Sequence, residues 1–462
     1  MEIKVSNLGA IREGTFDFAK RFSVFCGPNG TGKTYFAYVI YGLLKRKIHI
    51  PGKEKLAETL VNKKKATMEI DFLKLAKYRE SLIEATIRDI DELFGIGESD
   101  AMRIFKGFDC SFSTNNDDFK QIIIQSRIAT QQNIQGVNIR IEKEAGSTQV
   151  LLYVIDESIP TNIISSFRFF LDSHIYYLLS IYPIGGVEIF PVERNSIYTF
   201  SKELSIRKQD ALDHMQMLMN KKERIDVFDL LSSKRYPMPI RDGLNIAEDL
   251  TEVRKYNSPV SDFAKYMESD LLHGNVQISS EGEIQFKPTK SPQTVLPIQM
   301  TASVIKTLSS LDVYLHHNAK LNDLIIIDEP EINLHPDNQI MVARMLVRLM
   351  NHGFRILIST HSDYIIREIN NMVMMSNKNS AIVKEMVKKG KYLNDEYINP
   401  QDLGVYYFNY ATKRNKQVTV QKVNVEESGF SVPSIEKTIQ EQNSIAEDLY
   451  YGIKYDSKEL SK

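Results

Sequence analysis

The sequence predicts an α/β fold in which one long insertion separates two parts of a parallel sheet. The first observation is a pair of almost continuous apolar runs, 324–327 and 355–359, each preceded by a stretch with helical periodicity. Such runs are typical of parallel strands that helices cover on both faces. The second observation is a strand pattern at 21–26 that leads directly into a glycine-rich loop, followed by a helical pattern at 34–41. Because these segments lie far apart in the chain, we expect the region between them to be inserted into a common core.

The composition indicates a large globular protein. The chain has 462 residues, of which 25% are charged and 42% hydrophobic, and its net charge of −1 gives no general attraction to nucleic acid. Two cysteines, Cys26 and Cys110, cannot by themselves form a disulfide framework or a zinc site. The first residues lack the pattern of a signal peptide, and the sequence lacks an apolar run of about 18 residues. We therefore expect a cytoplasmic protein without a membrane partner.

The glycine-rich loop at 27–34 has the sequence GPNGTGKT, which fits G-x-x-x-x-G-K-[ST] at every fixed position. Glycines in this pattern let backbone N–H groups come close enough to surround a phosphate chain. We expect Lys33 to reach the β- and γ-phosphates and the Thr34 hydroxyl to bind Mg²⁺. A glycine-rich turn without a ligand is the alternative, but the flanking strand and helix favour a nucleoside triphosphate. The predicted nucleotide-binding residues are Asn29, Gly30, Thr31, Gly32, Lys33 and Thr34.

The hydrophobic pattern changes period several times along the chain, and each period predicts one kind of element. The other expected strands are 3–5, 14–18, 136–141, 149–155, 187–190, 405–408 and 417–420. The other expected helices are 53–95, 161–180, 201–224, 245–273, 302–319, 337–352 and 433–452, with a proline-containing loop at 236–239. The region 53–95 fits either an arm or a pair of packed helices, and it lacks the sustained heptads of a long coiled-coil rod.

The run LIIIDEPE at 324–331 ends in carboxylates, as a strand that serves a phosphate site does. Such a strand brings Asp328 to the phosphate edge of the sheet, where it can hold Mg²⁺. Glu329 is then placed to act as the base that polarises the attacking water. The pattern is weak alone but becomes specific together with the upstream glycine-rich loop. His361 follows the next strand, so we expect it at the same edge.

These motifs together resemble the RecF/SMC/OLD-like branch of the ABC ATPase superfamily. The phrase E-P-E-x-x-L-H-P is the most diagnostic, because transporter subunits usually carry Asp where His335 stands. Residues 190–194 also look like the P-x-x-R element of this branch. The segments that carry the resemblance are 5–10, 25–34, 328–336 and 359–362, and it extends over about 1–45 and 185–375.

The resemblance implies an ABC ATPase head, that is, a P-loop NTPase core with an antiparallel β subdomain, a mainly helical insertion and a short α+β C-terminal tail. It implies ATP held between two heads, hence at least a dimer, with His361 as the switch histidine that reads the γ-phosphate. Ser303, at the expected start of a helix, is the candidate for the signature residue that meets the nucleotide of the partner head. Val304 stands where the family has Gly, and a plain N-cap serine is the alternative. Residues 333–337 would form the D-loop.

We divide the chain into five predicted regions on this basis. They are the head lobe I with the P-loop (1–50), the helical and β-hairpin insertion (51–185), the P-x-x-R element with a helical region (186–295), the head lobe II (296–380), and the C-terminal hairpin and helix (381–462).

The function that the resemblance implies is a Mg²⁺-dependent ATPase that oligomerises through its heads. We expect it to act as the sensor or scaffold that gates a separate effector, a nuclease, in bacterial anti-phage defence of the PARIS or Septu kind. The alternative is a RecF/SMC-like DNA-repair ATPase that binds duplex DNA, which a basic stripe across both heads would indicate. A transporter subunit would need a full L-S-G-G-Q signature. An intrinsic TOPRIM nuclease would need a D-x-D motif after His361, and the sequence has neither.

Overall fold

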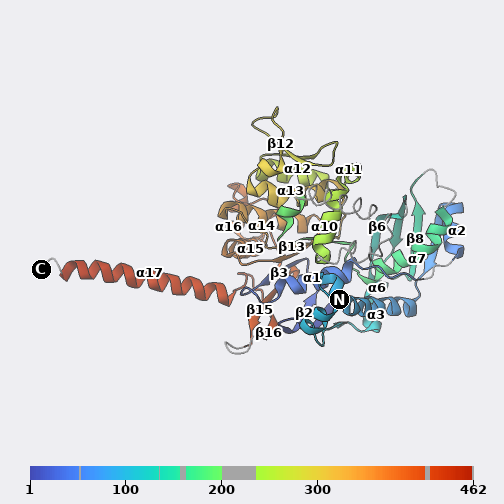
Figure 1. Cartoon of the computed structure of the whole chain (residues 1–462), viewed down its shortest axis with the longest axis horizontal. Helices are drawn as coiled ribbons and strands as arrows, with labels where there is room; N and C mark the ends of the chain where they lie inside the picture. The colour runs from blue at the N-terminus through green and yellow to red at the C-terminus, as the bar shows by residue number, and fades with distance from the viewer. Residues whose placement is uncertain (51–53, 135, 157–162, 200–235, 412–416, 460–462) are drawn as a thin grey trace, which may run out of the picture.

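A nine-stranded sheet forms the centre of the molecule in the computed structural model, which describes residues 1–50, 54–134, 136–156, 163–199, 236–411 and 417–459 (Figure 1). The strand order is β5-β1-β2-β16-β15-β3-β14-β13-β9. The strands are β1 Glu2–Leu8, β2 Ile11–Asp17, β3 Phe22–Cys26, β5 Asp109–Phe112, β9 Val187–Phe190, β13 Leu324–Asp328, β14 Arg355–Ser359, β15 Leu403–Tyr410 and β16 Val418–Val423. From β15 to β9 all neighbours are parallel, whereas β5/β1, β1/β2 and β15/β16 are antiparallel. The predicted α/β class is confirmed.

The parallel strands are buried on both faces, as their apolar runs predicted. In β3, Phe25 points into one hydrophobic core while Val24 and Cys26 point into the other. The same alternation holds in β13, where Ile326 joins the first core and Ile325 and Ile327 the second. Helix α1, Lys33–Lys45, belongs to the first core, and helices α13 Ser303–His317, α14 Pro336–Asn351 and α15 Asp363–Met374 belong to the second.

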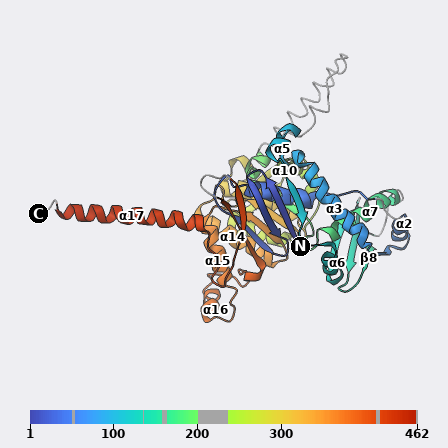
Figure 2. The same cartoon turned by 90° about the horizontal axis from the view of Figure 1, so that it is seen from below.

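The insertion forms a separate four-stranded sheet with helices packed against it (Figure 2). Its order is β4-β8-β7-β6, and the predicted hairpin is confirmed as β7 against β8, with Ile141 opposite Leu152. The strands are β4 Lys65–Glu69, β6 Ile128–Ile134, β7 Val137–Lys143 and β8 Gln149–Val154, and the helices are α2 Glu54–Lys63, α3 Phe72–Arg88, α4 Ile90–Phe94, α5 Glu98–Ile104, α6 Asn116–Gln125 and α7 Ile163–Ser180. The helical prediction for 53–95 is wrong at β4, where only two residues, Ala66 and Met68, alternate inward.

Short elements replace the single helix expected at 245–273. They are the end of α10 Met238–Glu248, then α11 Leu250–Val253, α12 Ser261–Met267 and the π-helical turn η1 Glu268–Leu272. After this range come β10 Gly274–Ile278, β11 Ile284–Pro288, β12 Leu296–Pro297 and the 3₁₀ turn η2 Ile298–Met300. The loop predicted at 236–239 is confirmed at 236–237 and wrong at 238–239, because α10 begins at Met238 and Pro239 lies in its first turn, where its missing N–H costs nothing. The helix predicted at 201–224 lies outside the described residues.

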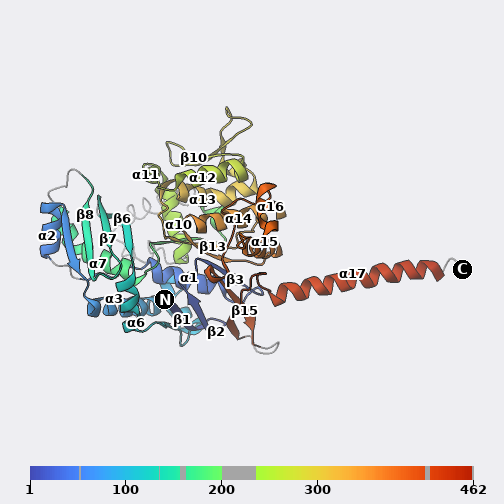
Figure 3. The ribbon, with the colours of Figure 1, turned by 180° about the vertical axis from the view of Figure 1, so that it is seen from behind.

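The C-terminal hairpin is part of the main sheet. β15 and β16 pair antiparallel, with Phe408 opposite Val420, which confirms the hairpin itself. Its place in the sheet, with β15 beside the P-loop strand β3, was not predicted from the sequence. After α16, Ala381–Lys388, the turn η3, Pro400–Asp402, and this hairpin, helix α17, Pro433–Glu459, extends away from the body (Figure 3). None of the described helices has both the length and the apolar character required to cross a bilayer. The predicted division into five regions stays a prediction.

Candidate functional site

The P-loop connects the end of β3 to the start of α1, and its glycines are required by the backbone. Gly27, Gly30 and Gly32 have φ of 129°, 72° and 89°, in the region that favours glycine. A Cβ on Gly27 would lie 2.1 Å from the carbonyl oxygen of Phe408 in β15. Because Gly32 is the N-cap of α1, the unpaired N–H groups of the first turn point into this loop and favour an anion.

Lys33 is held inside the loop. Its Nζ donates to the carbonyl oxygens of Gly27 and Pro28, each at 3.0 Å, and the side chain is buried. Burial lowers the pKa of Lys33 to about 8, against the opposite effect of the nearby carboxylates. Thr31 Oγ1 also donates to Pro28, and Tyr410 Oη donates to the carbonyl of Asn29. The loop is therefore braced from within and from β15.

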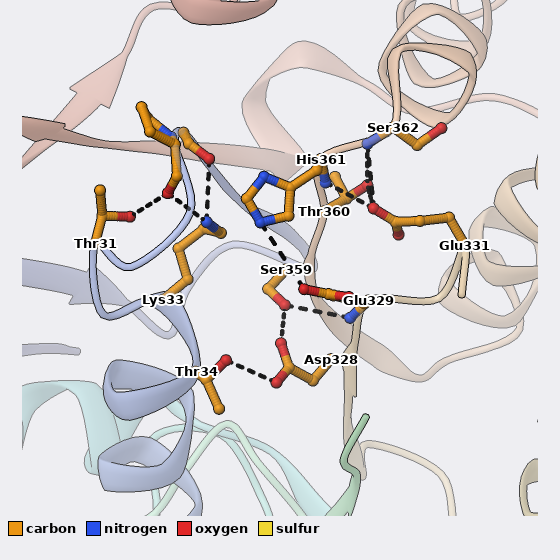
Figure 4. Close-up of polar contacts among 12 residues, drawn as sticks. Thr31, Lys33, Thr34, Asp328, Glu329, Glu331, Ser359, Thr360, His361 and Ser362 are labelled. Carbon is orange, nitrogen blue, oxygen red and sulfur yellow. Dashed lines mark hydrogen bonds and ion pairs between the residues drawn. The ribbon is translucent and has the colours of Figure 1, made fainter. Parts of the chain in front are cut away.

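The structure brings Thr34 and Asp328 together, although 294 positions separate them in the sequence (Figure 4). Thr34 Oγ1 donates to Asp328 Oδ2 at 2.8 Å, and the Ser359 hydroxyl donates to Asp328 Oδ1. Ser359 was not predicted as a site residue. Its signal was available, because it ends β14 in register with Asp328 at the end of β13. A hydroxyl and a carboxylate are the hard oxygen ligands that Mg²⁺ prefers, so the residues present fit this ion.

Glu329 and His361 lie beside this pair. His361 Nε2 is 3.9 Å from Glu329 Oε1, and the Glu329 backbone has φ of 47°. Burial and the neighbouring Asp328 raise the pKa of Glu329. Burial and Lys33 lower the pKa of His361 to about 4, so the imidazole is neutral at pH 7. The site thus pairs a carboxylate that holds a proton more readily than usual with a neutral histidine.

Arg194 supports the backbone that carries the two acidic residues. Its buried guanidinium donates to the carbonyl oxygens of Asp328 and Glu329, both at 2.7 Å, and to that of Pro191 at 3.0 Å. The P-x-x-R pattern identified Arg194 in the sequence, but not this role. A planar guanidinium suits several fixed carbonyls at once, which explains an arginine here.

Glu331 performs a similar role for the loop after β14. Its Oε1 accepts from Thr360 Oγ1 at 2.8 Å and from the backbone N–H groups of His361 at 2.6 Å and Ser362 at 3.1 Å. Figure 4 shows this carboxylate directed at the loop that carries the histidine. Glu331 is the second Glu of the E-P-E phrase, which makes it recognisable in the sequence, but it is not among the predicted site residues.

Ser303 is not hydrogen-bonded to the described residues of the nucleotide site. It is the first residue of α13 and is exposed, and among the described residues it makes no hydrogen bond with the P-loop. The alternative of a plain N-cap serine is wrong, because Ala302 occupies the N-cap position. A role toward the nucleotide of a second head stays a prediction.

A phosphate-binding loop between β3 and α1, an Asp–Thr pair at the sheet edge and a histidine after the next strand define a P-loop nucleotide-binding domain. The chain belongs to the AAA ATPase domain family, whose sequence profile matches residues 1–366. The Old nuclease of Escherichia phage P2 is 42% identical to this chain over 65 residues. That match covers 14% of this chain and 11% of Old nuclease, and it agrees with the predicted OLD-like resemblance.

Solved structures of SMC heads align over most of the chain with low similarity. The SmcHead bound to the C-winged helix domain of ScpA has a TM-score of 0.36 and 12% identity, over 92% of this chain and 98% of that one. The SMC head domain from Thermotoga maritima has a TM-score of 0.34 and 10% identity, with the same coverage. The Smc head with an extended coiled coil from Pyrococcus furiosus is bound to the C-terminal domain of ScpA. It has a TM-score of 0.35 and 13% identity, over 96% of this chain and 98% of that one.

Proposed function

We propose that the chain is a Mg²⁺-dependent ATP hydrolase. The observation that carries the proposal is the contact between Thr34 Oγ1 and Asp328 Oδ2 at 2.8 Å, with Lys33 beside it in the loop. A hydroxyl, a carboxylate and an ammonium group from two distant segments are the set that a nucleoside triphosphate with its metal requires. Glu329 and His361 supply the groups for hydrolysis at the same edge.

Each side chain has a role that follows from its surroundings. Lys33 and the N–H groups of the loop would bind the β- and γ-phosphates, and Thr34 and Asp328 would hold Mg²⁺, which supplies charge compensation when bound. Glu329 would orient the attacking water and accept its proton, a role helped by its raised pKa. Neutral His361 would hydrogen-bond to the γ-phosphate. Asn29, Gly30, Thr31 and Gly32 would complete the phosphate cradle.

The active form that we propose is a dimer of heads or a larger homo-oligomer. Ser303 at the N-terminus of α13 would meet the nucleotide of the second head, since a helix N-terminus favours an anion. The exposed side chains of Asn333, His335 and Asp337 support the D-loop prediction, because a segment that crosses between heads must be accessible in one chain.

The biological role that we propose is the gating of a separate nuclease in cytoplasmic anti-phage defence, of the PARIS or Septu kind. Two observations support it: the sequence motifs of the OLD-like branch and the local match to a phage protein named as a nuclease. The match spans 11% of that protein, and the proposal places the nuclease activity in a separate partner.

The enzymatic part is tested with two substitutions and a control. Lys33→Ala is expected to abolish nucleotide binding, because the ammonium group in the cradle is lost. Glu329→Gln is expected to keep ATP binding, lose hydrolysis and accumulate dimers in light scattering. Glu385→Gln, an exposed carboxylate on α16 that pairs with Lys389, is the control and should behave as wild type. Unchanged nucleotide affinity in Lys33→Ala, or normal turnover in Glu329→Gln, would refute the assigned roles.

The partner is tested by isolating tagged Glu329→Gln protein with ATP from its native cells. A stoichiometric protein with nuclease motifs and little DNA is the expected result. Duplex DNA that is lost steeply with salt, without a protein partner, would instead support the DNA-repair function.

A further inference from the structure

A second group of metal-ligand side chains lies outside the nucleotide site. Glu268 comes from the π-helical turn η1, and Asp312 and His316 come from α13. One ligand atom of each lies within 4.8 Å of the others. Asp312 and His316 are four residues apart, so they share one face of the helix. His316 Nε2 lies 3.5 Å from Glu268 Oε2 and 3.8 Å from Asp312 Oδ2.

Asp312 is the unusual member of the group. Its side chain is fully buried, and within the part of the chain that the structure describes neither carboxylate oxygen has a hydrogen-bond partner. A buried carboxylate without a partner is costly, so such a group calls for a compensating cation or a proton. Glu268, the other carboxylate, is also buried, which increases the cost of leaving both charged.

Glu268 is held in place by the neighbouring strand. Its Oε1 accepts from the Val276 N–H at 2.8 Å, and its Oε2 accepts from Asn275 Nδ2 at 3.0 Å. Each carboxylate oxygen has a second lone pair, so these bonds leave Glu268 able to bind a metal. Ligands whose carboxylates are hydrogen-bonded by neighbouring groups are typical of built metal sites. The π-helix that presents Glu268 is rare and is often found at functional sites.

We propose that Glu268, Asp312 and His316 bind a divalent transition-metal ion such as Zn²⁺. An imidazole with two carboxylates suits Zn²⁺ better than Mg²⁺, which prefers oxygen ligands and keeps its waters. Ligand atoms around tetrahedral Zn²⁺ are about 3.4 Å apart, given metal–ligand distances of about 2.1 Å. The separations of 3.5 and 3.8 Å from His316 are close to this value, and the two carboxylates, whose ligand atoms lie within 4.8 Å of each other, would draw together around the ion.

The ion would act as a structural tie. η1 follows α12, continues into β10 and packs against α13, so the ion would join elements that otherwise meet through apolar side chains and a few hydrogen bonds. His316 is the least buried ligand and gives the ion its access from solvent. This site does not depend on the nucleotide site, and its test does not use ATP hydrolysis.

The test measures Zn²⁺ binding to the full chain without nucleotide, by equilibrium dialysis with metal analysis and by thermal unfolding. Wild type is expected to bind one more Zn²⁺ than Asp312→Asn or His316→Gln, with affinity at that site weakened at least about 100-fold in either variant. Zn²⁺ should raise the Tm of wild type and of the control His352→Gln, an exposed histidine close to Asp395.

Asp312→Asn also shows whether the buried carboxyl group is costly in the metal-free protein. Without metal, this variant is expected to be at least as stable as wild type, because it removes a buried carboxyl group. If Asp312→Asn does not fold, His316→Gln decides, since its side chain reaches the surface. Equal Zn²⁺ binding and equal Zn²⁺-induced Tm shifts in wild type and His316→Gln would overturn the proposal, as would the absence of tight Zn²⁺ binding to wild type.

Discussion

Glu331 offers a sharp test of how the histidine loop is held. One of its oxygens accepts three hydrogen bonds from Thr360, His361 and Ser362, while the other is buried and has no hydrogen-bond partner among the described residues. Glu331→Gln keeps the shape but removes the charge, and charge-assisted hydrogen bonds are about twice as strong as neutral ones. Each bond then loses about 1 kcal/mol, or about 3 kcal/mol in total. The lower desolvation cost of an amide offsets part of this, so we expect a net loss of about 1–3 kcal/mol in stability.

The catalytic effect of Glu331→Gln should exceed its effect on nucleotide binding. The backbone N–H of His361 loses its charged acceptor, whereas among the described residues Glu331 makes no hydrogen bond with the P-loop and acts on Lys33 only through its charge. We therefore expect kcat to fall by about 10- to 100-fold with little change in ATP affinity, because small misplacement of a positioned group costs that much. Denaturant unfolding measures the first quantity, and single-turnover hydrolysis with separate nucleotide titration measures the second. An unchanged kcat alongside the expected loss of stability would refute the positioning role.

Three further predictions concern the P-loop and its supports. Arg194→Lys should lower the free energy of unfolding by about 3 kcal/mol and reduce kcat, because one ammonium group cannot replace the three hydrogen bonds of the guanidinium. Denaturant unfolding and hydrolysis assays check this, and wild-type values in both would contradict it. Because the pKa of Lys33 is about 8, its ammonium group loses its charge above pH 8. ATP affinity should therefore be constant below pH 8 and fall up to about tenfold per pH unit above it. Binding titrations measure this slope, and Lys33→Arg should remove it. Gly27→Ala should abolish nucleotide binding and destabilise the fold, because its Cβ meets a backbone carbonyl, whereas Gly97→Ala, with open space around it, should do neither in the same assays.

The sequence predicted the parts of the site whose signal is local. The residues at 27–34 and 324–329 identify themselves by spacing, and the structure joins Thr34 to Asp328 as expected. The metal cluster could not be predicted in this way. Glu268 is far from Asp312 in sequence, and nothing near it indicates that a π-helical turn will direct its carboxylate at α13.

The position of β15 could not be predicted for the same reason. Its apolar run fits any buried strand, and only the completed sheet determines that its partner is β3. The expected helix at 245–273 failed because 257–259, with the sequence NSP, interrupts the pattern. The helix-breaking residues at 257–259 are visible in the sequence, but the helical periodicity on either side of them favoured a single helix.

The position of β15 beside β3 also determines the order in which the sheet can fold during synthesis. During translation, β1, β2 and β3 leave the ribosome before β15 and β16, yet in the described sheet β2 and β3 are not neighbours and are joined through β16 and β15. The edge of β3 on that side therefore stays unpaired until residues 403–410 have been synthesised. The nucleotide-binding loop is incomplete before then, because the backbone of Phe408 lies against Gly27 and the Tyr410 hydroxyl donates to the carbonyl oxygen of Asn29. A nascent chain of this protein thus carries its phosphate-binding sequence before the strand that completes the binding site has been synthesised.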